Sequence, residues 1–263
     1  MVDDRAVLAD DVVVGPGCVI EGAVTLGAGC RLIGHVFLQG PMTLGERNIM
    51  YPNVCLGYAP QDVKIDPATF VGAGTVIGDR NFFREGVTIH RATGKRPTTV
   101  GNDNYFMCNS HLGHDVILGN NCQLANGSLI AGHVEVQDNV ILGGNSGVHQ
   151  FCRVGRLSMI SGIEAITKDL PPFCVSYNSH TVGSLNLVGL RRGDLRPHID
   201  DLRRAFDIMY RSGLANDSAV ARIRGELGHD TLCMEFADFI ASTKRGICPY
   251  VRHVELHEKS PTI

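Results

Sequence analysis

The stretch VGNDNYFMCNSHLGHDVILGNNCQLANGSLIAGHVEVQDNVILGGNSGVHQFCRVGRLSMISGIEAITKD (residues 100–169) carries an aliphatic or aromatic residue at every sixth position. These residues are Val100, Phe106, Leu112, Leu118, Leu124, Ile130, Val136, Leu142, Val148, Val154, Ile160 and Ile166. A period of six fits neither an amphipathic helix nor a simple alternating strand. It indicates a solenoid whose repeat is one short strand and one corner. The aliphatic side chain fills the interior, and glycine or asparagine makes the turn, where a positive φ costs little.

The same period begins at Leu8 and breaks twice, at 57–70 and at 91–99. Neither break fits the wall of a solenoid, so both segments are predicted to loop outward. Loops on a rigid scaffold commonly carry function. Between the breaks the period resumes at Val71, and segment 65–76 therefore reads as one extra hexad.

After about residue 185 the period changes to that of amphipathic helices. Apolar residues recur at helical spacing within 197–213, 216–228 and 230–246. The sequence therefore predicts a mainly β solenoid at 1–185, followed by a small α-helical C-terminal domain and tail at 186–263.

Composition argues against several functional classes. A net charge of −3 over 263 residues gives no electrostatic case for binding nucleic acid. Nine cysteines without paired spacing fit neither a disulfide framework nor a zinc knuckle. The N-terminus is acidic and lacks a long apolar run, so we expect neither a signal peptide nor a membrane anchor. A cytoplasmic protein is the expectation.

The hexad pattern resembles that of the left-handed parallel β-helix proteins built from hexapeptide repeats. In that family three hexads make one coil of a triangular prism, so residues eighteen apart stack. The stacking places His114, Gly132 and Gln150 in one column, and Asp115 and His133 in the next. Successive coils are about 4.8 Å apart, so these side chains should share one edge of the prism. Gln150 and His133 are suited to hydrogen-bonding a polar substrate.

Two further histidines belong to this predicted edge: His149 lies on it, and His111 lies just before the corner. Histidine is suited to removing a proton from a hydroxyl group near neutral pH. His114 has an acidic neighbour, Asp115, which would orient it. The N–H of Gly132, one coil further on, is a plausible oxyanion donor. The cluster therefore predicts general-base catalysis.

A metal site is the main alternative for such a cluster. Zinc needs three or four convergent ligands. Hexapeptide-repeat proteins of the γ-carbonic anhydrase type use three histidines, two of them in an H-x4-H spacing. Here His111 and His114 are three apart and the predicted prism contains no H-x4-H, so we predict no metal.

Six segments resemble the UDP-N-acetylglucosamine 3-O-acyltransferase family, the enzymes of the first lipid A step in Gram-negative bacteria. They are HLGHD (111–115), AGHVEV (131–136), GVHQFCRVG (147–155), KDLPPF (168–173), GDRNFFREGVTIHR (78–91) and QDVK (61–64). The resemblance implies transfer of a (3-hydroxy)fatty acyl group from acyl carrier protein to the 3-hydroxyl of UDP-N-acetylglucosamine. It implies no cofactor beyond the phosphopantetheine that carries the acyl group. It also implies a homotrimer with active sites between subunits.

The resemblance assigns roles to individual residues. His114 matches the general base, Asp115 the acid beside it, and Gly132 the oxyanion glycine. The other matches are His111, His133, His149 and Gln150 around the sugar and acyl group, Asp62 and Lys64 on an outward loop that reaches substrate in a neighbouring subunit, Asn186, Arg191 and Arg192 at the uridine and phosphates, and Gly162 where acyl length is set. The small Gly162 implies room for a longer chain.

The acyl carrier protein is acidic, so Arg153 and Arg156, if exposed near the site, are predicted to dock it. The chain departs from the family pattern at 65–76 and in the short 91–99 segment. Both changes surround the nucleotide-sugar end. They leave open transfer to a different acceptor, such as the nitrogen of a 3-amino UDP-sugar. A γ-carbonic-anhydrase-like metalloenzyme and a non-catalytic scaffold are the alternatives from other classes.

Overall fold

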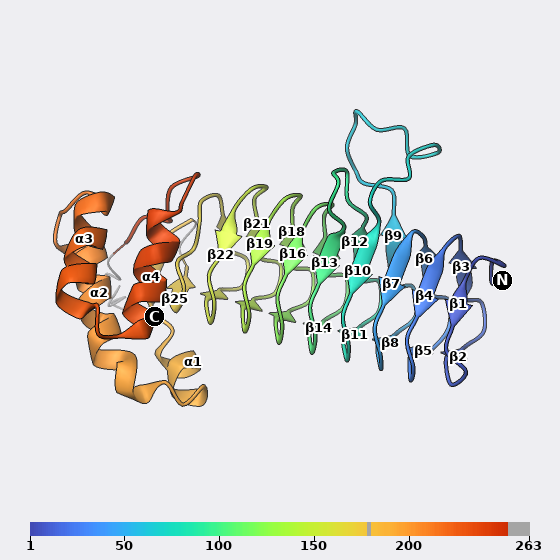
Figure 1. Ribbon diagram of the computed structural model, residues 1–263, viewed down its shortest axis with the longest axis horizontal. Coiled ribbons are helices and arrows are strands. Elements are labelled where there is room, and N and C mark those ends of the chain that lie inside the picture. The colour runs from blue at the N-terminus through green and yellow to red at the C-terminus, as the bar shows by residue number, and fades with distance from the viewer. Residues whose placement is uncertain (178–179, 252–263) are drawn as a thin grey trace, which may run out of the picture.

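The computed structural model describes residues 1–177 and 180–251, which form a long triangular prism with helices stacked at one end (Figure 1). Strands of successive coils pair in parallel and build three walls, here called the first, second and third wall. The first wall consists of β1 (Val7–Leu8), β4 (Val24–Leu26), β7 (Met42–Leu44), β10 (Thr75–Ile77), β13 (Thr98–Val100), β16 (Ile117–Leu118), β19 (Glu135–Val136) and β22 (Arg153–Val154).

The second wall is the longest because the chain adds an antiparallel strand, β26, at its C-terminal end. It consists of β2 (Val13–Val14), β5 (Arg31–Leu32), β8 (Ile49–Met50), β11 (Phe82–Phe83), β14 (Tyr105–Phe106), β17 (Gln123–Leu124), β20 (Ile141–Leu142), β23 (Met159–Ile160), β25 (Cys174–Ser176) and β26 (Val182–Leu185). The third wall consists of β3 (Val19–Glu21), β6 (Phe37–Gln39), β9 (Cys55–Tyr58), β12 (Thr88–His90), β15 (His111–Leu112), β18 (Leu129–Ile130), β21 (Gly147–Val148) and β24 (Ala165–Ile166).

The interior of the prism is the apolar column that the hexads predict. None of the twelve hexad residues between Val100 and Ile166 is more than 3% exposed. Corners are closed by residues with positive φ, many of them asparagine, which tolerates this region better than most residues. At one corner the buried amides of Asn48, Asn81 and Asn104 stack and bond to one another. At the asparagine and glycine corners an aliphatic filler is therefore combined with a turn of low conformational cost.

The register between successive coils shows where the six-residue period of the sequence is interrupted. From β15 to β24 paired residues are eighteen apart, as in His111 and Leu129. Cys55 pairs with Thr88 at an offset of 33, and Thr88 pairs with His111 at an offset of 23. The surplus residues leave the prism as two loops.

The predicted extra hexad at 65–76 is wrong. Val71 is 62% exposed, and the next strand begins only at Thr75. Gly72 and Gly74 adopt φ of 63° and 80°, so the chain turns here instead of extending into a wall. Apolar spacing alone does not separate a hexad from a short apolar run in a loop.

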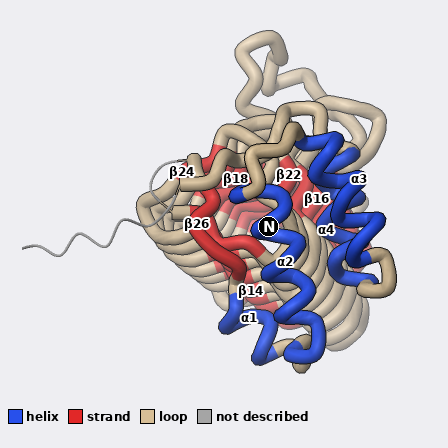
Figure 2. The backbone as a smooth tube through the Cα atoms, turned by 90° about the vertical axis from the view of Figure 1, so that its left-hand side faces the viewer, coloured by secondary structure: helices blue, strands red, loops and turns tan. Residues whose placement is uncertain are grey.

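The helices are α1 (Leu187–Arg192), a 3₁₀ turn η1 (Arg196–His198), α2 (Ile199–Arg211), α3 (Asn216–Leu227) and α4 (Thr231–Ala241). They cover the C-terminal end of the prism (Figure 2). The Asp230 carboxylate caps α4 by accepting from the N–H groups of Leu232 and Cys233. The left-handed parallel β-helix with a small helical domain is thereby confirmed. Most of the predicted tail, 252–263, lies outside the described residues.

Arg153 and Arg156 attach the helical domain to the prism and are not free to dock a carrier protein. Arg153 pairs with the buried carboxylate of Asp169 at 2.8 Å and donates to the Phe239 carbonyl of α4. Arg156 forms two hydrogen bonds with Glu235 of α4. The docking prediction is corrected on this point, because both guanidinium groups already have an acidic partner.

No helix in the described ranges is both long and apolar enough to cross a lipid bilayer. The nine cysteines are all free thiols, and seven of them are buried.

Candidate active site

One edge of the prism, where the third wall passes into the first, gathers most of the predicted residues. We call it the third–first edge. Loop 59–74 leaves it between β9 and β10, and loop 91–97 leaves it one coil later, between β12 and β13 (Figure 1). The next three coils place His114, Gly132 and Gln150 at the same edge.

His114 and Asp115 form a hydrogen-bonded pair on this edge. The His114 Nδ1 lies 2.7 Å from the Asp115 Oδ2, and their side chains are 17% and 11% exposed. An ionised carboxylate only accepts hydrogen bonds, so the proton of the neutral imidazole resides on Nδ1. The Nε2 lone pair is then free to take a proton, which is the arrangement a general base requires.

The Asp115 carboxylate is held by loop 91–97. Its Oδ2 accepts from the Thr93 hydroxyl at 2.6 Å and from the Thr93 N–H at 3.0 Å, and its Oδ1 accepts from the Gly94 N–H at 3.0 Å. Burial alone would raise the pKa of Asp115, but the hydrogen bonds from Thr93, His114 and Gly94 outweigh it and lower the pKa to about 2. The group is therefore ionised at neutral pH.

Gly132 lies directly against the His114 ring. A Cβ built on Gly132 would come within 2.7 Å of the ring Cε1 and 2.8 Å of Nε2. The residue is buried, and its N–H donates to no acceptor within residues 1–177 and 180–251. A backbone donor on the residue that packs against the imidazole is suited to an oxyanion that forms near the proton acceptor.

His133 stands between His114 and Phe151. Its ring meets His114 edge-on at 5.1 Å and stacks on Phe151 at 4.7 Å. Its Nε2 lies 3.7 Å from the Asp115 Oδ2. His114, Asp115 and His133 each place one ligand-type atom within 4.8 Å of the others. Two of these atoms are already joined in the His114–Asp115 hydrogen bond, which a metal ion would have to replace.

A groove of about 710 Å³ runs along the third wall beside the pair. It is lined by Gln61, His90, His111, Gly113, His114, Leu129, Ile130, Ala131, Gly132, Gly147, Val148, His149, Gln150, Ala165, Ile166 and Thr167. On the wall face, His111, Leu129, Gly147 and Ala165 follow one another in register. The groove therefore joins a polar end at the histidines to an apolar floor.

The sequence reasoning missed His90, which meets His111 edge-on at 4.9 Å. His111 in turn is 2.8 Å from the Thr88 hydroxyl through Nδ1. Burial, followed by the neighbouring His111 and His114, lowers the pKa of His90 to about 4. Burial and His114 also lower the pKa of His111. The groove therefore holds neutral imidazoles that bond polar groups without attracting anions.

This burial predicts a pH-dependent stability. The folded pKa of His90 lies below the unfolded value, so its neutral ring contributes stability that is complete above pH 6.5 and is lost as the pH falls through about 4. The His90→Gln variant has no such titration. We expect its free energy of unfolding to fall by about 3 kcal/mol less than that of the wild type between pH 7 and pH 4. Denaturant titrations at both pH values measure the difference, and equal losses would contradict it.

The far end of the groove contains His149 and Gln150. The His149 Nδ1 lies 3.2 Å from the Gln150 carbonyl and 3.4 Å from Nη2 of Arg245, a residue that follows α4. Arg245 also donates to the Thr167 carbonyl. Gly162 does not line the groove. It lies in the turn between β23 and β24, at the opposite edge of the third wall.

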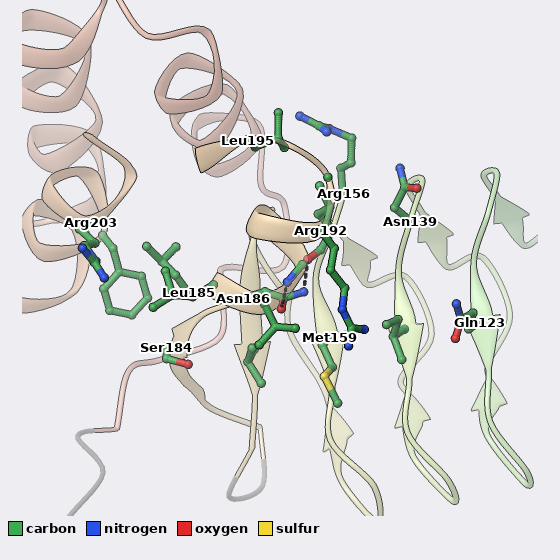
Figure 3. A pocket seen from close by; sticks show the side chains of 18 of the residues that line it. Gln123, Asn139, Arg156, Met159, Ser184, Leu185, Asn186, Arg192, Leu195 and Arg203 are labelled. Carbon is green, nitrogen blue, oxygen red and sulfur yellow. Dashed lines mark hydrogen bonds between the residues drawn. The ribbon is translucent and has the colours of Figure 1, made fainter. Parts of the chain in front are cut away.

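A second cavity, of about 1050 Å³, lies between the second wall and helices α1 and α2 (Figure 3). Asn186 and Arg192 line it and Arg191 does not. The Asn186 side chain caps α1 by accepting from the Gly189 N–H and donates to the Leu157 carbonyl. The predicted nucleotide-binding residues are thus divided: Arg192 faces the cavity, Asn186 has a structural role there, and Arg191 lies outside it.

Asp62 and Lys64 lie on loop 59–74 and do not line the groove of their own chain. The Asp62 carboxylate accepts from the Lys64 N–H at 2.9 Å and so closes a turn at the loop tip. Of this loop, only Gln61 reaches the groove. A single chain therefore does not bring the predicted loop residues together with His114.

Known proteins resemble this chain over nearly its whole length. Residues 169–248 match the family model described as Udp N-acetylglucosamine O-acyltransferase, domain 2, and residues 97–132 match that of the bacterial transferase hexapeptide (six repeats). The acyl-[acyl-carrier-protein]–UDP-N-acetylglucosamine O-acyltransferase of Anaeromyxobacter sp. (strain Fw109-5) is 39% identical over 216 residues, which cover 80% of this chain and 82% of that protein. The protein of the same name from Stutzerimonas stutzeri (strain A1501) is 38% identical over 253 residues, covering 94% and 96%.

Solved structures of the same family are similar to this chain. The UDP-N-acetylglucosamine O-acyltransferase of Moraxella catarrhalis RH4 superposes with a TM-score of 0.89 at 34% identity, over 94% of this chain and 97% of that one. The UDP-N-acetylglucosamine acyltransferase of Francisella novicida gives a TM-score of 0.87 at 34% identity, over 97% and 92%. The chain therefore belongs to the UDP-N-acetylglucosamine O-acyltransferase family.

Proposed function

We propose that this protein transfers a (3-hydroxy)fatty acyl group from the thioester of an acyl carrier protein to the 3-hydroxyl of UDP-N-acetylglucosamine, the first step of lipid A biosynthesis. The observation that carries the proposal is the geometry of three residues. His114 has a free Nε2, Asp115 is ionised and bonded to the opposite ring nitrogen, and Gly132, whose N–H has no acceptor among the described residues, packs against the same ring. The names of the relatives supply the donor and the acceptor.

In the proposed mechanism the Nε2 of His114 takes the proton from the sugar hydroxyl. The oxygen attacks the thioester carbonyl, and the developing oxyanion accepts from the Gly132 N–H. Asp115 stabilises the imidazolium that forms. The tetrahedral intermediate collapses with cleavage of the C–S bond, and the Nε2 proton passes to the leaving thiolate of phosphopantetheine. Protein side chains carry each proton, so the proposal includes no metal and no resident cofactor.

Two further elements of the proposal follow from the fold and the family. We propose a homotrimer, because Asp62 and Lys64 lie on a projecting loop that does not reach the groove of its own chain. A neighbouring subunit would bring these residues to the substrate. We also propose a cytoplasmic location, which suits nine free thiols and a carrier-protein donor.

The direct test is acyl transfer from 3-hydroxyacyl-carrier protein to UDP-N-acetylglucosamine, with the corresponding 3-amino UDP-sugar as competitor. We expect ester product and a clear preference for the hydroxyl acceptor. Preference for the amine would move the reaction to N-acylation. No product with either acceptor, from folded protein, would contradict acyl transfer to a UDP-amino sugar.

Gly147 supplies a test of the groove as the donor site. Glycine weakens a strand, yet the fold has room for a side chain here: a Cβ would meet the Ala165 Cβ at an ordinary 3.7 Å. The missing side chain therefore serves the groove, where the acyl–pantetheine chain would pass. Gly147→Ala is expected to lower kcat/KM for the longest accepted donor about tenfold and for short donors less. If Gly147→Ala lowered kcat/KM by the same factor for long and short donors, this placement would be contradicted.

A further inference from the structure

The Asp115 backbone and the Asp115 carboxylate are held by different residues. The Asp115 N–H donates to the buried Thr98 hydroxyl at 2.8 Å, which fixes a backbone with a φ of 60°. The carboxylate is fixed separately by the hydroxyl and N–H of Thr93 and the N–H of Gly94. Within the described residues its ion-pair partners are two histidines and no arginine or lysine. Neutral donors of loop 91–97 therefore set the carboxylate orientation.

Loop 91–97 is itself tied to the prism just before Thr93. Arg91 is 5% exposed and donates to the carbonyls of Gly40 and Phe70. Ala92 forms a β-bridge with Gly74. The position of Thr93 is thus fixed from one side by buried contacts, and its hydroxyl bonds to the carboxylate that faces the base.

We propose that Thr93 is a positioning residue of the acyl-transfer reaction: its hydroxyl holds the Asp115 carboxylate so that Oδ2 meets Nδ1 of His114 and leaves Nε2 free for the substrate proton. The proposal rests on the proposed function. Three geometric facts support it. The Thr93 hydroxyl bond, at 2.6 Å, is the shortest that Asp115 makes; it ends on the same oxygen that bonds His114; and the carboxylate is only 11% exposed. Water is therefore a poor substitute when the hydroxyl is removed.

The test compares Thr93→Val, which keeps the shape and removes the hydroxyl, with Thr93→Ser, which keeps the hydroxyl. Loss of a hydrogen bond to a charged group predicts a fall in kcat of about 10- to 100-fold in Thr93→Val. KM for donor and acceptor should stay within about threefold, because Thr93 does not line the groove. Thr93→Ser should recover most of the wild-type kcat. Thr93→Ala removes the same hydroxyl without the branched side chain and should match Thr93→Val.

Thr99→Val is the matched control, because its hydroxyl bonds the Pro97 carbonyl in the same segment and does not contact Asp115. Its kcat should equal that of the wild type. The ¹⁵N NMR shifts of the His114 imidazole give a readout that a general loosening of the loop does not mimic. The wild type should show protonated Nδ1 and unprotonated Nε2, and Thr93→Val a shift towards the other tautomer.

Two kinetic outcomes would overturn the proposal: an unchanged kcat in folded Thr93→Val, or equal losses in Thr93→Ser and Thr93→Val. The tautomer measurement needs no substrate. If the wild type failed to acylate UDP-N-acetylglucosamine while Thr93→Val still altered the His114 tautomer, the proposed function would fail and the positioning role would stand. If the tautomer stayed the same in all variants, the positioning role would fail by itself.

Discussion

Replacing His114 with alanine is expected to lower kcat by about 1000-fold, within the range that general acid–base catalysis contributes. The variant keeps the Gly132 N–H and the groove, so binding of donor and acceptor should persist while proton removal does not. KM should therefore change little in comparison with kcat. Steady-state kinetics with saturating acyl carrier protein measure the effect.

His229→Ala is the control, because that imidazole lies on the helical domain and pairs with Asp201 far along the chain from the groove. It should leave kcat unchanged. Added imidazole should restore part of the activity of His114→Ala, because Asp115 and its donors from Thr93 and Gly94 remain in place to orient it. If His114→Ala kept activity within tenfold of the wild type, the general base would have to be another group.

Gly132→Ala is expected to lower kcat by about 100-fold. The new methyl group would lie 2.7 Å from the Cε1 of His114, so the ring has to move. Misplacement of a catalytic group by about 1 Å costs on the order of 100-fold in rate. The backbone N–H is retained in this variant, so the loss measures displacement of the base and not removal of the oxyanion donor.

Gly144→Ala is the matched control. Gly144 lies in the turn between β20 and β21, at the edge between the second and third walls. A Cβ there would meet only the Asn126 carbonyl, at an ordinary 3.5 Å. We expect kcat and thermal stability close to the wild type. A Gly132→Ala enzyme with a kcat within threefold of the wild type would show that the ring does not rest on this glycine during catalysis.

The fold was predictable because the interior of the prism accepts one kind of residue at one interval. Leu112, Leu118 and Leu124 are each within 1% of full burial, and no competing period fits them. The column of His114, Gly132 and Gln150 followed from the eighteen-residue coil, which holds without interruption from β15 to β24. The coil position of a residue was therefore predictable wherever the register was unbroken.

Beyond the unbroken register the sequence was less informative. His90 meets His111 between two strands paired at an offset of 23 residues, because loop 91–97 intervenes, and Thr93 bonds Asp115 only after that loop folds back. The acidic partners of Arg153 and Arg156 could not be predicted from the sequence either. Glu235 belongs to a helix whose docking on the prism no local pattern specifies. The capping role of Asn186, by contrast, had a recognisable signal, since asparagine is favoured directly before a helix.

The two loops of the third–first edge have an evolutionary consequence. Residues inserted at a corner form a loop outside the prism, so every strand stays in the same wall beside the same strands. The pairing offsets of 33 and 23 residues demonstrate this. Residues added within a strand would instead turn interior side chains outward. Length variation among relatives should therefore concentrate at this edge, next to the base. Such variation would change the loop residues beside the groove, among them Gln61, and leave the strands of its floor in register, so the rim of the site is free to diverge while its floor is kept.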